Sequence, residues 1–285
     1  MTKKHSFFGS DPFLAFAHRG GTGAWPENTM RAFGHAVEIG YKYIETDVHL
    51  TSDGIVIAFH DSKLDRVTDS TGSISDLKWD QIQEARVGGT DPIPLFEELL
   101  EEFPLVKINI DPKHDEVVEP LADLLIKHNA LDRVCVGSFS DRRIDRIQKL
   151  LGGKACTSAG PKGVAKFRVS NFGIGKPRFS FDCLQVPVRQ SGIPLVDQRF
   201  VDNAHKNGLQ VHVWTIDDPS EIKEGSLTAL EFKLTLSAPA LNNSFIPFNE
   251  LIPPPTVKGI VTASEVRLTI STKVDLFSCV AVISR

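Results

Sequence analysis

The feature that most constrains the fold is an alternation of short apolar runs with longer amphipathic stretches. The apolar run Phe13–Ala17 is followed by the helix-like stretch Thr29–Ile39 and then by the strand-like run Tyr43–Leu50. Parallel strands need a long crossover between them, which is usually a helix, so this alternation is typical of parallel β-α units. The sequence therefore predicts an α/β fold built on a parallel sheet.

The same alternation continues to about residue 215. Further helices are expected at Ile93–Glu102, Val117–His128, Arg142–Leu151 and Gln198–Asn207. Further extended runs are Ile55–His60, Leu105–Ile110, Arg133–Gly137, Lys154–Thr157, Leu184–Val186 and Gln210–Thr215. About seven strands suit a barrel of eight, and an open doubly wound sheet is the alternative.

A single domain spanning residues 1–285 accounts for the length, because α/β barrels routinely reach ~250 residues as one unit. Two segments break the rhythm. Asp61–Pro92 has several turn signals and little periodicity, which predicts an insertion after the second β unit. From about residue 223 to 285 the β-α pattern dissolves into an atypical tail. Because a barrel must close its edges, Lys258–Thr262 is predicted to pair between Gln210–Thr215 and Phe13–Ala17 as the eighth strand.

Charge and patterning exclude several classes of partner. The net charge of −4 and the absence of a Lys/Arg-rich run argue against nucleic acid. The sequence has no run of ~18 apolar residues, so no transmembrane helix is expected. No export signal is visible, and a cytoplasmic location is therefore the default expectation. The four cysteines lie far apart without a C-x-x-C pair, and we interpret them as buried free thiols.

A pair of carboxylates marks the second predicted strand. Glu45, Asp47 and His49 fall on one face, because strand side chains alternate with period two. Close carboxylates in a polar cavity repel one another unless a cation neutralises them, and hard oxygen ligands suit Mg²⁺, Ca²⁺ or Mn²⁺. The alternative is an exposed strand with ordinary solvated acids.

Polar residues also share one face of a later strand. Asn109, Asp111 and Lys113 alternate with Ile108 and Ile110. Catalytic groups of α/β barrels sit at the carboxyl ends of the strands, so Asp111 could complete a metal site. The alternative is a strand-end acid followed by a surface lysine.

Two histidines close apolar runs. His18 follows Phe13–Ala17 and precedes Arg19, while His60 follows Ile55–Phe59. A lone histidine at a strand end is usually incidental, but two on one rim with carboxylates and an arginine form a set suited to phosphoryl transfer. A histidine can act as base for water and as acid for a leaving alcohol, and an arginine offers a bidentate fork to phosphate oxygens.

Several short strings together resemble one family. They are Ala17-His18-Arg19-Gly20, Pro26-Glu27-Asn28-Thr29, Glu45-Thr46-Asp47-Val48, Asp53-Gly54, Phe59-His60-Asp61, Asn109-Ile110-Asp111-Pro112-Lys113, Val136-Gly137-Ser138-Phe139 and Val211-His212-Val213-Trp214-Thr215. Their order and spacing, over roughly residues 13–222, resemble the signature of glycerophosphodiester phosphodiesterases.

That resemblance implies a TIM barrel and a metal-dependent hydrolase of lipid and glycerol metabolism. The reaction that the resemblance implies releases glycerol 3-phosphate and an alcohol from a small glycerophosphodiester. The implied roles are metal binding for Glu45, Asp47 and Asp111, acid/base catalysis for His18 and His60, phosphate binding for Arg19 and Lys113, and a place near the alcohol for Trp214. Mg²⁺ or Ca²⁺ is the implied cofactor, with Mn²⁺ as a third possibility.

Two departures from the family pattern stand out. Asp111 occupies the third ligand position, where many members use glutamate, and the usual continuation after Ile222 is missing, with Gly259–Ala263 as a displaced remnant. Two alternatives follow: a lysophospholipase D-like activity on lipid phosphodiesters, and a catalytically silent barrel that serves as a binding module. Neither the head group nor the oligomeric state can be read from the sequence.

Overall fold

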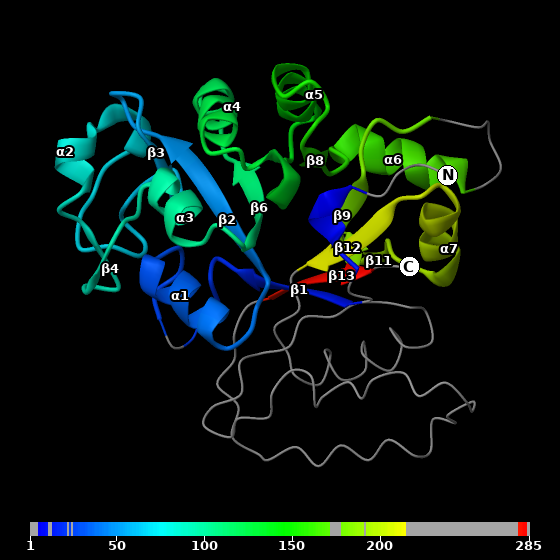
Figure 1. The fold of residues 1–285 in the computed structure, drawn as a ribbon, viewed down its shortest axis with the longest axis horizontal. Helices are drawn as coiled ribbons and strands as arrows, with labels where there is room; N and C mark the ends of the chain where they lie inside the picture. Colours follow the sequence, from blue (N-terminus) through cyan, green and yellow to red (C-terminus); the bar gives the residue numbers. More distant parts are fainter. Residues whose placement is uncertain are drawn as a thin grey trace, which may run out of the picture.

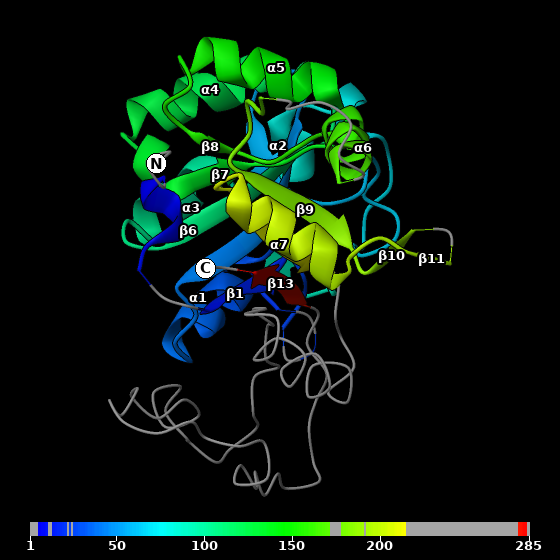
Figure 2. The same ribbon diagram turned by 90° about the vertical axis from the view of Figure 1, so that its right-hand side faces the viewer.

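The structure is a computed structural model that describes residues 5–10, 13–21, 23, 25–171, 178–190, 192–214 and 279–283. Eight of its strands form a barrel (Figures 1 and 2). They are β1 (Phe13–His18), β2 (Tyr43–Leu50), β6 (Lys107–Pro112), β7 (Val134–Val136), β8 (Cys156–Thr157), β9 (Cys183–Pro187), β12 (Gln210–Trp214) and β13 (Cys279–Ile283). Their order is β8-β7-β6-β2-β1-β13-β12-β9, and a parallel bridge between Ser158 and Cys183 joins the two ends. The predicted TIM-type barrel is confirmed.

Six helices surround the strands on the outside (Figure 2). They are α1 (Met30–Glu38), α3 (Phe96–Glu102), α4 (Val118–Lys127), α5 (Asp141–Leu150), α6 (Pro161–Ser170) and α7 (Gln198–Lys206). Three start at the side-chain caps that their sequences supply, because Thr29, Ser140 and Asp197 each accept a hydrogen bond from a backbone N–H in the first turn. The sequence analysis had not predicted α6.

The strand that closes the barrel is not the one predicted. β13 pairs antiparallel with β1, Phe13 opposite Ile283, and antiparallel with β12, Val211 opposite Ile283. The predicted place of Lys258–Thr262 between these two strands was therefore wrong, and that segment lies outside the described residues. The tail does supply a closing strand. An antiparallel strand satisfies the same N–H and C=O groups of both neighbours, so closure does not require a parallel one.

The run Ile55–His60 is also not a barrel strand. Its central part, β3 (Val56–Ala58), pairs antiparallel with the end of β2. The segment that follows contains η2 (Ile74–Asp76), α2 (Trp79–Ile82), β4 (Arg86–Val87) and β5 (Asp91–Pro92), with a hydrophobic cluster of its own that includes Phe59, Leu64 and Ile74. The predicted insertion is thus a small packed layer beside the barrel.

The N-terminal segment covers the amino ends of the barrel strands. In η1 (Ser6–Phe8), both phenylalanines are buried, and the backbone oxygen of Phe7 accepts a hydrogen bond of 3.0 Å from the Tyr43 hydroxyl. Lys107 Nζ donates to the Ser6 oxygen at 3.0 Å. Tyr43 and Lys107 begin β2 and β6, so the opposite, carboxyl end of the barrel is the end that is left for a site. Within the described residues, no helix is long and apolar enough to cross a membrane.

Removal of residues 279–285 is expected to lower the stability of the chain. Without β13, the edges of β1 and β12 would expose unpaired backbone groups, which favour association. We expect a lower thermal midpoint and higher oligomers in size-exclusion chromatography. A truncated protein that stays monomeric with an unchanged midpoint would show that β13 is dispensable for closure.

Candidate active site

Strand register brings four of the predicted residues to one end of the barrel. His18 lies beside Glu45 across the β1–β2 pair, and Asp47 lies beside Asp111 across the β2–β6 pair. Paired residues of neighbouring strands project to the same side of a sheet, so these side chains gather near the carboxyl ends of three consecutive barrel strands. The structure places Glu45, Asp47 and Asp111 as strand parity predicted, and the roles of these residues stay predictions.

The carboxylates are deeply buried. Glu45 is 6% exposed and Asp47 2%, and Asp111 Oδ1 is buried without a hydrogen-bond partner. Burial raises the pKa of Glu45, and the charge of Asp47 adds to this effect. Burial also raises the pKa of Asp111. For Asp47, burial is the largest influence and acts in the same upward direction, but the positive groups around it, Lys113 first among them, together lower the pKa. Burial therefore disfavours the charged forms of Glu45 and Asp111 unless a cation lies close to them.

Two cations compensate part of this charge. Lys113 Nζ lies 2.6 Å from Asp47 Oδ1 and 2.9 Å from Asp111 Oδ2. Arg19 Nε lies 3.5 Å from Asp47 Oδ2, and its Nη1 is 3.1 Å from Glu27 Oε1. The Arg19 backbone N–H also donates to Glu45 Oε2 at 3.1 Å. Asp47 is therefore the centre of a charged network that joins the predicted metal ligands to the predicted phosphate-binding residues.

The donor chemistry of Glu45, Asp47 and Asp111 fits a hard divalent cation, and the unpartnered Asp111 oxygen is an acceptor still to be satisfied. Their arrangement is looser than a closed site. The three are not among the groups of described residues whose ligand atoms all lie within 4.8 Å of one another. Lys113 lies between two of the three, so an ion would compete with its ammonium group for the same oxygens.

His18 is held as a neutral side chain. Its Nε2 lies 3.7 Å from Glu45 Oε2, and its Nδ1 is buried without a partner. Burial, with the nearby Arg19 charge, lowers the pKa of His18 to about 4. Near pH 7 this imidazole is therefore unprotonated and can accept a proton.

The turn after His18 needs Gly20. This glycine has a φ of +81°, and a Cβ at its position would approach Ala32 Cβ to 2.9 Å.

His60 reaches the same region from the end of the β3 segment. Its Nδ1 lies 2.5 Å from Asp61 Oδ1, and Arg66 Nε donates to Asp61 Oδ2 at 2.5 Å. Hydrogen bonds from Arg66 lower the pKa of Asp61 to about 2. Arg66 also donates to Glu27 Oε1 at 2.6 Å, and Glu27 binds Arg19. A chain of charged hydrogen bonds thus connects His60 to the phosphate-binding arginine.

The sequence analysis gave no role to several residues of this network. Asn28, with a φ of +55°, donates from Nδ2 to Asp47 Oδ2 at 3.3 Å and accepts from the Thr46 hydroxyl at 2.8 Å. Glu27, Asp61 and Arg66 carry the chain described above. Glu27 and Asn28 lie in the string Pro26–Thr29, and Asp61 lies in Phe59–Asp61, so the family strings already contained these three residues. Arg66 lies outside every string.

An aromatic pair stands on the rim. Trp214 ends β12, and its ring centroid lies 5.6 Å from that of Phe139 in an edge-to-face contact. Phe139 is 67% exposed, which is high for an aromatic side chain of its size. The structure therefore places Trp214 at the carboxyl edge of the barrel together with an exposed apolar partner.

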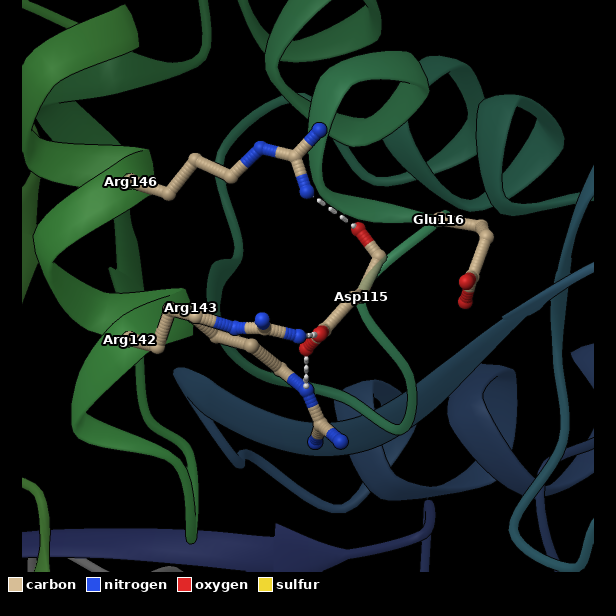
Figure 3. Close-up of a pocket in the computed structure, with 5 residues that line it drawn as sticks. All are labelled: Asp115, Glu116, Arg142, Arg143 and Arg146. Carbon is tan, nitrogen blue, oxygen red and sulfur yellow. Dashed lines mark hydrogen bonds and ion pairs between the residues drawn. The ribbon is translucent and has the colours of Figure 1, made fainter.

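Three arginines of α5 hold the loop that follows β6 (Figure 3). Arg142 and Arg143 approach the carboxylate of Asp115, and Arg146 donates to the Asp115 backbone oxygen at 3.1 Å. Arg143 Nη1 also donates to the Pro112 oxygen at 2.9 Å. Since Pro112 separates Asp111 from Lys113, these contacts fix the strand end that carries both residues.

Asp61→Asn tests whether the His60 contact matters. The amide cannot carry the negative charge that accepts from His60 and Arg66, so the ring loses its fixed orientation. We expect turnover to fall by ~10- to 100-fold with little change in KM. Asp80→Asn, the same exchange at an exposed position of α2, is the control. Equal turnover of Asp61→Asn and wild type would leave the contact without a catalytic role.

Comparisons with known proteins show which family the chain resembles. The profile of the glycerophosphoryl diester phosphodiesterase family matches residues 18–229. The chain is 36% identical over 213 residues to a protein named probable glycerophosphodiester phosphodiesterase 2 of Mycobacterium tuberculosis, across 72% of this chain and 80% of the relative. It is 27% identical over 244 residues to lysophospholipase D GDPD1 of Rattus norvegicus, across 73% of this chain and 78% of the relative.

A solved structure shows the same fold. It is that of a phosphodiesterase from Oleispira antarctica in complex with the product sn-glycerol-3-phosphate, and it aligns with a TM-score of 0.62 at 23% identity. The alignment covers 76% of this chain and 88% of that one.

Proposed function

The chain belongs to the glycerophosphoryl diester phosphodiesterase family, and we propose that it hydrolyses small glycerophosphodiesters to glycerol 3-phosphate and an alcohol. The observation that carries this proposal is the convergence of His18, Arg19, Glu45, Asp47 and Lys113 at the carboxyl end of three neighbouring strands. The product bound to the structural relative from Oleispira antarctica supports the choice of substrate.

The carboxylates Glu45, Asp47 and Asp111 would hold the metal ion, Mg²⁺ or Ca²⁺, with Mn²⁺ as a third candidate. When bound, it would supply Lewis-acid neutralisation of the negative charge on the phosphate. Three carboxylates, a divalent ion, a phosphodiester monoanion and two basic side chains are together electrically neutral. The excess negative charge of the protein site alone supports this cofactor.

Arg19 and Lys113 would bind the phosphate oxygens. Both already lie against Asp47, so a phosphate that approaches the site meets cations that are held in place by a buried carboxylate. Such fixed charges stabilise the transition state without reorganisation, and the planar guanidinium of Arg19 can contact two oxygens at once. Trp214, with Phe139, would border the alcohol group.

The two histidines would share the proton transfers. The low pKa of His18, about 4, leaves its ring unprotonated near pH 7, so His18 would be the group that accepts a proton from the attacking hydroxyl. His60 has Nδ1 engaged with Asp61, so the proton that it exchanges is the one on Nε2, where it would protonate the leaving alcohol. The attacking group is either water or the neighbouring hydroxyl of glycerol, which would form a cyclic phosphate first; both routes stay open.

A substrate panel tests the proposal. Glycerophosphocholine, glycerophosphoethanolamine, lysophosphatidylcholine and a chromogenic diester would each be assayed with Mg²⁺, Ca²⁺, Mn²⁺ or EDTA. We expect metal-dependent release of glycerol 3-phosphate from the glycerophosphodiesters and the highest kcat/KM on one of these two. No turnover of any substrate with any ion would instead support the silent binding module.

Lysophospholipase D activity is the second candidate, and the exposed Phe139 beside Trp214 is the observation in its favour. An apolar surface at the rim could receive an acyl chain, and a relative at 27% identity is named for this activity. Phe139→Ala should then lower kcat/KM on lysophosphatidylcholine by ~10-fold and leave glycerophosphocholine within about twofold. Equal effects on both substrates would count against an acyl-chain contact.

The cytoplasmic location and the single-domain boundaries stay predictions.

A further inference from the structure

Three of the four cysteines meet inside the barrel, far from each other in the sequence. Cys135 lies in β7, Cys156 in β8 and Cys183 at the start of β9, and each is fully buried. Their sulfur atoms all lie within 4.8 Å of one another, and Cys135 Sγ is 3.8 Å from Cys183 Sγ. Strand pairing explains this convergence, since Cys135 is the direct partner of Cys156 and Ser158 bridges to Cys183.

This arrangement changes the interpretation made from the sequence. The sequence was interpreted as holding buried free thiols, and these three are free and buried, but they also form a cluster. The three cysteines border apolar side chains, among them Phe7 and Phe16, and within this cluster each thiol also lies near two other sulfurs. Two polar groups lie at the edge of the cluster. Gln185 Nε2, which donates to Asn109 Oδ1 at 2.7 Å, is also 3.8 Å from Cys135 Sγ, and the Cys183 thiol donates to the Thr157 backbone oxygen at 3.8 Å.

We propose that Cys135, Cys156 and Cys183 form a binding site for a soft monovalent cation, Cu(I), separate from the carboxylate site. Sulfur ligands select soft ions and reject Mg²⁺ and Ca²⁺, which need oxygen. Three sulfurs at this spacing can bind one ion that lies between them, and Cu(I) accepts such a low coordination number.

Charge favours Cu(I) over Zn²⁺. A fully buried site tolerates little net charge. One Cu(I) that displaces one thiol proton gives a neutral group of one thiolate, two thiols and the ion, and the proton leaves to water. Zn²⁺ needs two thiolates for neutrality and a fourth ligand for its tetrahedral preference. Among the described residues, the cluster offers three ligands, which are the three cysteines.

The position of the site predicts its effect. β8 has two residues, and its contact with β9 includes a single bridge between Ser158 and Cys183. An ion held by one cysteine from each of β7, β8 and β9 would tie this short seam together. Binding to the folded state alone stabilises it, so the thermal midpoint should rise when the ion is present.

The test is copper binding to the full-length reduced chain. Cu(I) would be delivered from a competing colourless chelator under a non-thiol reductant, with Zn²⁺ in a parallel arm. An ion added to the folded chain could enter a buried site slowly. Protein produced in copper-supplemented medium, where the ion is present while the chain folds, would therefore also be analysed for metal content. We expect one Cu(I) per chain, a sulfur-to-copper charge-transfer absorption, and a midpoint about 5 °C higher at 100-fold excess over Kd.

Variants locate the ion. Cys135→Ser, Cys156→Ser and Cys183→Ser should each weaken binding by at least ~100-fold, since even outer contacts of a metal site are worth up to that much. Cys279→Ser, which removes the fourth thiol of the chain, should bind as the wild type does. If a serine variant does not fold, the alanine variant at the same position replaces it, and metal-free midpoints are compared. Absence of copper in both preparations, preference for Zn²⁺, or equal copper in the triple variant would overturn the proposal.

Discussion

His18→Ala and His60→Ala should each reduce kcat on glycerophosphocholine by ~10²-fold or more, with the fold intact. Both histidines act on protons that move in the transition state, so their loss should change kcat more than KM. The two losses should also be less than additive, because the two proton transfers belong to the same displacement at phosphorus. Steady-state kinetics of both single variants and the double variant would measure this.

His128→Ala is the matched control. His128 follows α4 and binds Glu97 at 2.7 Å, away from the carboxyl ends of the strands. It should keep wild-type kcat, and circular dichroism should confirm that all the variants are folded. If His18→Ala retained a near-normal rate, His18 would have no part in the mechanism, and its low pKa would reflect burial alone.

Asp47→Asn should have the largest single effect, a loss of about 10³-fold in kcat/KM. Its carboxylate is a predicted metal ligand and also contacts Lys113, Arg19 and Asn28, so the amide would take one of two carboxylate partners from each cation. Loss of metal-derived charge stabilisation of about 4 kcal/mol corresponds to this factor.

EDTA should produce a comparable loss in the wild type, and Mg²⁺, Ca²⁺ or Mn²⁺ should restore the rate. Asp47→Asn should need a higher concentration of that ion, whereas Asp145→Asn, at an exposed position on α5, should not. Full activity after exhaustive chelation would exclude the metal. An unchanged metal requirement of Asp47→Asn would restrict Asp47 to holding Lys113.

The sequence was sufficient for the part of the site that depends on strand parity. Glu45 and Asp47 alternate along one strand and Asp111 lies on the next barrel strand, so their common face follows from the pleat alone. His18 follows in the same way, since it ends the strand on the other side of β2. The face on which each side chain lies is set by short-range geometry, which a single sequence contains, whereas the register between the strands comes from the structure.

The errors arose where long-range pairing decides. β3 and a barrel strand look alike as short apolar runs, and only its partner shows that Val56–Ala58 forms a hairpin with β2. The choice of β13 over Lys258–Thr262 is of the same kind. The thiol cluster was missed because Cys135, Cys156 and Cys183 are joined by strand register and not by sequence spacing.

Phosphorus NMR of glycerophosphocholine turnover in water enriched in ¹⁸O tests the central claim most directly. The full-length chain with its activating metal ion should convert the diester signal into that of glycerol 3-phosphate, with one ¹⁸O bound to phosphorus and unlabelled choline released. His18→Ala under the same conditions should leave the diester signal almost unchanged. Release of phosphocholine and glycerol, or a wild-type spectrum without product, would contradict the assignment of this barrel as a glycerophosphodiester phosphodiesterase.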